Sequence, residues 1–229
     1  MSNLAIIIII GETILMLFYL IFYYRWGSKT VLGLKAATSL GFVVLGLLNL
    51  KQANELRAGT TVFIGLVCGF LGDIILGFRH LYRSHKRELF YGGLLLFFVG
   101  HVVYILAFLS LRSGQGFLIV LVALVLLAVV YLLSRHYHID YGDAKNAVFA
   151  YMAVSSLLLS LVFINVISAY SKLKLLIFIG ALSFVISDFL LSFIYFRKMS
   201  RPKIRLFKAV NIVSYYLGQT LFAVSICLM

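Results

Sequence analysis

Residues 60–78 read TTVFIGLVCGFLGDIILGF, an apolar run with one charged side chain, Asp73. As a helix, a run of this length crosses a hydrocarbon core of about 30 Å, which needs roughly 20 residues. Seven similar runs cover residues 4–24, 31–50, 89–111, 117–133, 147–167, 175–196 and 207–228. Backbone groups in lipid must be paired within the segment, and these runs are too long and too uniformly apolar for barrel strands. The sequence therefore predicts an all-α polytopic membrane protein with eight transmembrane helices.

The distribution of basic residues predicts how the chain is oriented. Of all residues 63% are hydrophobic, the mean hydropathy is +1.10 and the net charge is +13. Fourteen of the 20 Lys and Arg residues lie in or beside the first, third, fifth and seventh loops, and five lie in the others. The positive-inside rule then predicts a multi-pass integral membrane protein with both termini on the non-cytoplasmic side. Topology and attraction to anionic headgroups explain the basic charge, so we expect no nucleic-acid partner.

Two of the runs resemble each other. Residues 62–78, VFIGLVCGFLGDIILGF, align without gaps on residues 177–193, IFIGALSFVISDFLLSF. The alignment predicts one transmembrane domain, residues 1–229, built from two four-helix halves of roughly 1–114 and 115–229. Four spans in each half make the repeat parallel, so Asp73 and Asp188 are expected at the same depth, in the cytoplasmic half of the bilayer. The alternative is chance similarity, because Leu, Ile and Phe are common throughout the chain.

Ionisable residues inside the runs are costly, at roughly 2.5 to 3.5 kcal/mol each even on the lenient insertion scale. Glycines recur every four residues around Asp73, at positions 65, 69 and 77, which places them on the same helix face as the carboxyl group. Small residues at this spacing let another helix approach closely, so Asp73 is expected to face a neighbouring helix. Five ionisable residues lie at bilayer depth within the runs, namely Glu12, Lys35, Asp73, His101 and Asp188, and Lys208 lies at the mouth of the last run. Glu12 has no counterpart in the second half and stays unassigned.

Further polar side chains are expected to converge with the two aspartates on one chamber. Their helical spacing groups Lys35 with Thr38 and Ser39, His101 with Tyr104, and Asn211 with Tyr215, Gln219 and Lys208. Each group has a purely structural alternative. Asp73 and Lys35 can form a buried ion pair, His101 can be a satisfied core histidine, and the stripe from Asn211 to Gln219 can make interhelical hydrogen bonds.

Four motifs occur in order along these runs. They are G-D-x-x-L at 72–76, G-H-x-x-Y at 100–104, S-D-x-x-L at 187–191 and Y-x-x-x-Q at 215–219. Taken together, the chain resembles the YhhN family, the lysoplasmalogenases. The resemblance implies an integral membrane ether hydrolase that cleaves the vinyl ether bond of lysoplasmalogens, releasing a fatty aldehyde and a glycerophospho-base. It also implies that Asp73 and Asp188 carry the chemistry, and that the site includes Lys35, His101, Tyr215 and Gln219. The chain has Ala36 after Lys35, where such proteins often have proline.

The chemistry of vinyl ether hydrolysis agrees with two carboxyl groups. The alkenyl carbon needs a proton, the resulting oxocarbenium needs stabilisation, and water must attack before the hemiacetal collapses. A protonated acid and an ionised carboxylate supply these functions, as they do in glycoside hydrolysis. Lys35 or Lys208 is a candidate to hold the substrate phosphate. Membrane lysophospholipid and water are the expected partners, and no cofactor or bound metal is expected.

Two other functions use the same residues. Paired intramembrane carboxylates, a parallel repeat and a central histidine also suit a proton-coupled transporter of small molecules or lipids. A zinc-dependent lipid hydrolase would need several intramembrane histidines, and only His101 lies within the predicted spans.

Overall fold

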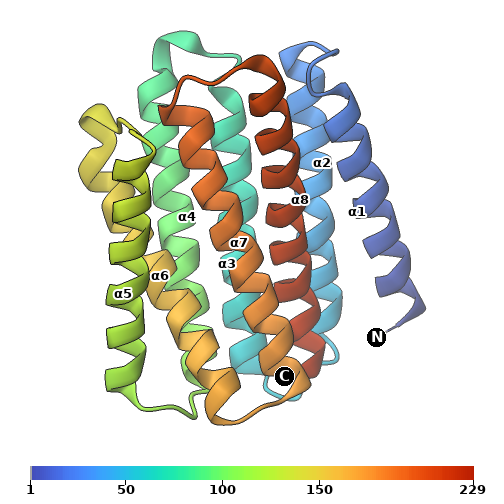
Figure 1. The fold of residues 1–229 in the computed structure, drawn as a ribbon. Helices are drawn as coiled ribbons and strands as arrows, with labels where there is room; N and C mark the ends of the chain where they lie inside the picture. Colours follow the sequence, from blue (N-terminus) through green and yellow to red (C-terminus); the bar gives the residue numbers. More distant parts are fainter. Residues whose placement is uncertain (1) are drawn as a thin grey trace. The chain divides into compact units, whose positions relative to one another are not determined.

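Eight long helices form the protein, which is described by a computed structural model covering residues 2–229 (Figure 1). They are α1 (Asn3–Phe22), α2 (Ser28–Leu50), α3 (Leu56–Phe78), α4 (Lys86–Leu109), α5 (Gly116–His136), α6 (Lys145–Ser168), α7 (Lys172–Phe196) and α8 (Arg201–Ser225), with short 3-10 turns at Arg83–His85, Gly142–Ala144 and Ile226–Leu228. No strand occurs in residues 2–229. All eight helices are long and apolar enough to cross a membrane. The predicted all-α, eight-span fold class is confirmed.

Several helices extend into polar residues beyond the predicted apolar runs. Helix α8 starts at Arg201, ahead of the apolar run predicted from residue 207, and α4 and α6 start at Lys86 and Lys145. A hydropathy search stops at the first charges, whereas backbone hydrogen bonding continues through polar residues in the headgroup region. Ser171 caps α7 by accepting a hydrogen bond from the backbone N–H of Lys174 at 3.2 Å.

The chain divides into two compact units. The first contains the chain through Ala107 together with Gln219–Met229, and the second contains Phe108–Gly218. These bounds differ from the predicted halves because the last turns of α8 pack with the first unit. There, Asn49 donates to the Ala223 carbonyl at 2.9 Å, and the Glu55 N–H donates to the Met229 carbonyl at 3.0 Å. The internal repeat itself stays a prediction.

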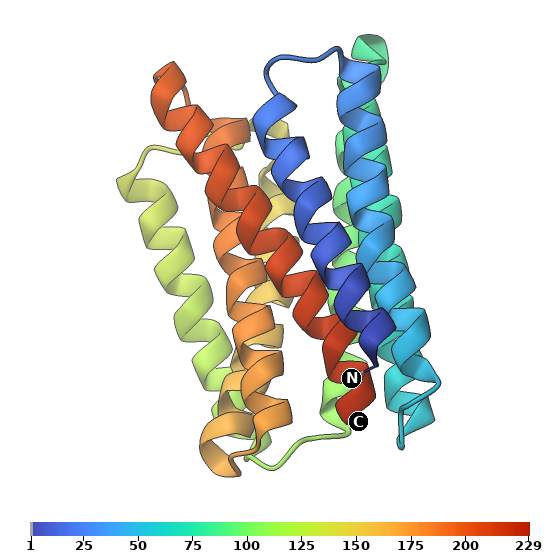
Figure 2. The same ribbon diagram turned by 90° about the vertical axis from the view of Figure 1, so that its right-hand side faces the viewer.

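In the first unit, α2 packs against both α1 and α3. Figures 1 and 2 both show α1 and α2 side by side, with the start of α1 and the end of α8 at the same end of this unit. An even number of spans places both ends of the chain on the same side of the membrane, whichever side that is. Phe42, Leu45, Leu66 and Phe222 are fully buried and form the centre of its core.

The second unit repeats this order of neighbours, with α6 packing against both α5 and α7. Ser160 on α6 donates to the Ile119 carbonyl of α5 at 2.5 Å. The outward faces of α5 and, in the first unit, of α1 stay apolar, with Phe117 at 73% and Ile7 at 63% exposed. Such faces are expected to contact lipid, because lipid needs no polar cover.

Candidate functional site

Asp73 lies on α3 and is 3% exposed. Its Oδ1 forms an ion pair with Lys35 Nζ at 2.8 Å, and its Oδ2 accepts a hydrogen bond from Ser39 Oγ at 2.6 Å. Lys35 and Ser39 are one turn apart on α2, so the same helix face supplies both groups. The prediction that Asp73 faces a neighbouring helix is confirmed, and so is the ion pair that formed its structural alternative.

The glycine face of α3 brings the other helices of the first unit close. A Cβ at Gly65 would overlap the ring of Tyr104 on α4, and one at Gly77 would overlap Leu32 on α2. Gly72, outside the predicted stripe, is also close-packed, though less tightly: a Cβ there would lie 2.9 Å from the ring of Phe97. The glycines therefore serve packing, and this packing is what lets α2 and α4 approach the helix that carries Asp73.

His101 and Tyr104 are both buried in the first unit and both have identified partners. Tyr104 Oη donates to Gln219 Oε1 on α8 at 2.7 Å, with both residues at most 1% exposed. His101 Nδ1 lies 2.9 Å from the Phe97 carbonyl, which can only accept, so Nδ1 carries the proton. His101 is thus oriented by its own helix through Nδ1. The alternative of a satisfied core histidine stays a prediction.

Asp188 is the corresponding carboxyl of the second unit, on α7, and it is partly buried. Its Oδ2 accepts a hydrogen bond from Tyr151 Oη of α6 at 2.7 Å. Ser155, one turn further along α6, is near the same carboxyl group, but its Oγ forms no hydrogen bond with any described residue. We did not predict Tyr151 as a site residue. The signal available in the sequence is its spacing: Tyr151 and Ser155 are four residues apart on the helix before Asp188, as Lys35 and Ser39 are before Asp73.

The polar stripe of α8 is divided between the two units. Asn211 Nδ2 donates to Ser187 on α7, at 2.9 Å to its carbonyl and 2.7 Å to its Oγ. The ring of Tyr215 packs edge-on against Phe184, with centroids 5.3 Å apart, and Gln219 pairs with Tyr104 in the first unit. Interhelical hydrogen bonding is confirmed for Asn211 and Gln219. A single chamber that joins residues of both units stays a prediction.

The sequence matches the YhhN family over residues 11–226, which contain every candidate residue named above. The chain belongs to the YhhN family. No curated protein and no solved structure matches it. The family match thus agrees with the resemblance carried by the four short motifs, and it extends over all eight helices.

A metal centre in this YhhN protein would need three or four side-chain ligands close together. Within residues 2–229, no three His, Cys, Asp or Glu side chains are grouped in that way. Cys68 and Cys227 are free thiols.

Glu12 has a defined place in the YhhN fold that the sequence did not indicate. The side chain is 4% exposed on α1, and its Oε1 accepts a hydrogen bond from Thr220 Oγ1 of α8 at 3.0 Å. Its Oε2 is buried with no hydrogen-bond partner among the described residues. A Cβ added at Gly41 of α2 would lie 3.0 Å from its Cβ. The carboxyl group therefore lies where three helices of the first unit meet.

Proposed function

We propose that this YhhN protein is a lysoplasmalogenase. In this proposal it hydrolyses the vinyl ether bond of lysoplasmenylethanolamine or lysoplasmenylcholine to a fatty aldehyde and glycerophosphoethanolamine or glycerophosphocholine. The observation that carries the proposal is the pair of carboxyl groups in the two D-x-x-L motifs. Each is held by a side chain of the preceding helix, in a chain that matches the family from residue 11 to 226.

The two carboxyl groups divide the chemistry between them in this proposal. Asp73 is paired with the ammonium of Lys35, so we assign it the part of the ionised carboxylate, which stabilises the oxocarbenium and accepts a proton from water. Asp188 then delivers the proton to the alkenyl carbon. Water adds to the cation, and the hemiacetal collapses to aldehyde and alcohol, which restores both protonation states.

In this proposal Lys35 does not hold the substrate phosphate, which was the role expected from the sequence. Because its ammonium lies 2.8 Å from Asp73 Oδ1, it balances the charge of that carboxylate. In the proposal Lys35 is a positioning residue for Asp73, and the substrate phosphate is held by other basic residues.

The test is aldehyde release by the purified 229-residue chain from lysoplasmenylethanolamine, with the saturated alkyl ether analogue as substrate control. We expect aldehyde from the vinyl ether alone. Asp73→Asn and Asp188→Asn should each lower turnover by at least about 10³-fold, since each removes a group that acts in the transition state. Glu88→Gln, which removes an exposed carboxylate at the start of α4, should leave turnover unchanged. A folded wild-type protein that releases no aldehyde contradicts the proposal.

One observation favours a second function, that of a proton-coupled transporter. Asp73 is buried in its ion pair with Lys35, and protonating Asp73 would break the pair, which is how a proton can drive a change of conformation. Proteoliposomes distinguish the two functions. A transporter would move protons across the membrane in response to a substrate and release no aldehyde, whereas the hydrolase would release aldehyde without a proton gradient.

A further inference from the structure

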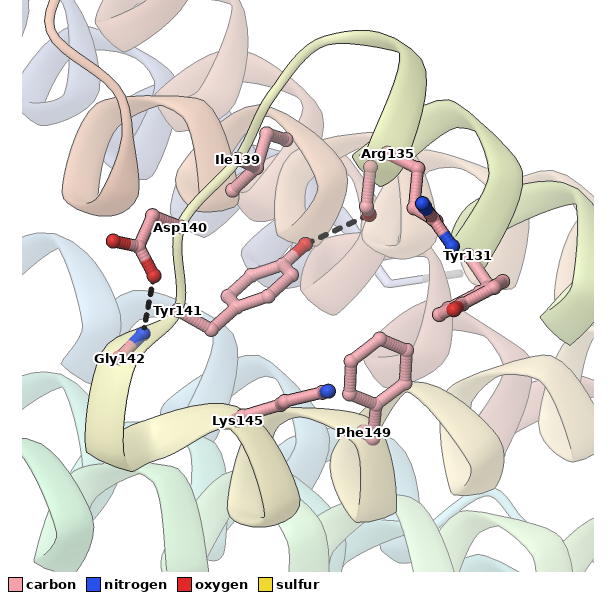
Figure 3. Close-up of a pocket in the computed structure, with 9 residues that line it drawn as sticks. Tyr131, Arg135, Ile139, Asp140, Tyr141, Gly142, Lys145 and Phe149 are labelled. Atoms are coloured by element: carbon pink, nitrogen blue, oxygen red, sulfur yellow. Dashed lines mark hydrogen bonds between the residues drawn. The ribbon is translucent and has the colours of Figure 1, made fainter.

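A cavity of about 290 Å³ lies in the second unit where α5 ends and α6 begins (Figure 3). Arg135 comes from the last turn of α5, and Lys145 is the first residue of α6. Both line the cavity, together with the rings of Tyr131, Tyr141 and Phe149. The function proposed above uses none of these residues.

The loop between the two helices is ordered by its own hydrogen bonds. The Ile139 N–H donates to the Ser134 carbonyl at 2.9 Å, and Tyr141 Oη lies 2.8 Å from Ser134 Oγ. His138 takes a positive φ of 51° just after the end of α5, a common way for a helix to end, and Gly142, with φ of 50°, begins the 3-10 turn before α6. The Tyr141 ring is thereby fixed against Phe149, with centroids 5.7 Å apart. The cavity is therefore preformed on one side.

The cavity carries more positive than negative charge, since Arg135 and Lys145 line it with one carboxylate, Asp140. Among residues 2–229, no carboxylate lies within ion-pairing distance of Arg135 or Lys145. Asp140 also borders the cavity, but its Oδ1 accepts the Gly142 N–H at 3.0 Å, and Figure 3 shows it beyond the Tyr141 ring from Arg135. A guanidinium and an ammonium that face one cavity are suited to binding phosphate oxygens.

The size and position of the cavity favour a lipid headgroup as the source of that phosphate. A volume of about 290 Å³ approaches the range of small-molecule sites, which starts near 300 Å³, and far exceeds the roughly 30 Å³ that one water occupies. The cavity also lies at the ends of two helices apolar enough to span the membrane, on the side with the most basic loops. Tyrosines at such helix ends lie at the level of the headgroups.

We propose that this cavity binds the phosphate of a glycerophospholipid. Arg135 and Lys145 hold the phosphate oxygens, and the walls formed by Tyr131, Tyr141 and Phe149 pack against the glycerol. The proposal rests on the cavity alone and does not depend on vinyl ether hydrolysis. A phosphate held by Lys145 would nevertheless lie near the proposed reaction. Lys145 precedes Tyr151, the partner of Asp188, by a helix rise of about 9 Å.

The test measures how much 1-palmitoyl-lysophosphatidylethanolamine the purified full chain retains in detergent, by native mass spectrometry. We expect Arg135→Gln and Lys145→Gln each to lower retention by about tenfold, and the double variant by more. Lys198→Gln, which removes an exposed cation outside the cavity, should retain the lipid as the wild type does. Arg135→Lys, which keeps the charge, should recover part of the binding. Circular dichroism confirms that each variant is folded.

Three results would overturn the proposal. One is undiminished retention by the folded double variant. Another is equal retention of 1-palmitoylglycerol, which lacks the phosphate. The third is displacement of the lipid by inorganic phosphate at equal concentration, which would make the cavity a site for free phosphate. The Asp188→Asn variant should retain the lipid as the wild type does, whether or not the wild-type protein hydrolyses vinyl ethers. Failure of the enzyme proposal and failure of the phosphate-site proposal are therefore distinguishable.

Discussion

The carboxyl groups of Asp73 and Asp188 occupy matching positions in the two aligned helices, yet they are held by different chemistry. In the first unit an ammonium and a serine hydroxyl contact Asp73, at 2.8 and 2.6 Å. In the second unit a tyrosine hydroxyl contacts Asp188 at 2.7 Å. In both units the contact comes from the helix before, α2 in one and α6 in the other.

The comparison shows that the same four-residue spacing on the preceding helix supplies carboxyl partners of different chemistry. Lys35 and Ser39 correspond in spacing to Tyr151 and Ser155, so the serine is kept and the residue one turn before it changes from cation to phenol. A cation cancels the charge of its carboxylate, whereas a phenol only donates a hydrogen bond to it. The two aligned positions thereby have different electrostatics, as the acid and the base of the proposed reaction would need.

The largest effect is expected from breaking the charged pair of the first unit. Lys35→Met leaves Asp73 buried without its counter-charge, which should lower the free energy of unfolding by about 3–5 kcal/mol. The measurement is a denaturation titration with sodium dodecyl sulfate in mixed micelles. The double variant Lys35→Met with Asp73→Asn should recover most of the loss, because no unpaired charge is then left. A single variant as stable as the wild type would mean that the ion pair is absent in the membrane protein.

An intermediate effect is expected from the two tyrosine hydroxyls, which form a matched pair across the units. Tyr151 donates to a carboxyl group and Tyr104 to an amide, both at 2.7 Å. Asp188 is the protonated acid of the proposed reaction, so both acceptors are neutral, and Tyr151→Phe and Tyr104→Phe should each cost about 1 kcal/mol in the same titration. A cost of about 2 kcal/mol or more for Tyr151→Phe alone would show that Asp188 is ionised, and the contrast with Asp73 would then be lost.

The smallest effect is expected at Glu12, the buried carboxyl without a counterpart in the repeat. Glu12→Gln keeps an oxygen to accept from Thr220 and replaces Oε2, which has no hydrogen-bond partner among the described residues, with an uncharged NH2 group of similar size. The free energy of unfolding should change by no more than about 0.5 kcal/mol. Thr220→Val, which removes the donor itself, is the control and should cost about 1 kcal/mol. A loss of several kcal/mol in Glu12→Gln would place Glu12 with Asp73, as a carboxylate whose charge is needed.

Much of the fold and part of the site were predictable from the sequence. Eight apolar runs of sufficient length leave the chain no other way to pair its backbone in lipid, so the helices follow from hydropathy alone. The glycine spacing of α3 likewise predicted that Asp73 faces inward, because residues four apart share a helix face whatever surrounds them.

Only the tertiary structure decided which side chains meet. Sequence periodicity shows which face of a helix is polar. The partner of that face depends on how neighbouring helices are rotated and shifted along their axes, and the loops and the core packing determine those rotations and shifts. Four features depend on such shifts. They are the hydrogen bond from Tyr151 to Asp188, the hydrogen bond from Thr220 to Glu12, the packing of the last turns of α8 in the first unit, and the cavity lined by Arg135 and Lys145. Local sequence determines the helices and their inward faces, and the register between helices determines the chemistry that those faces form.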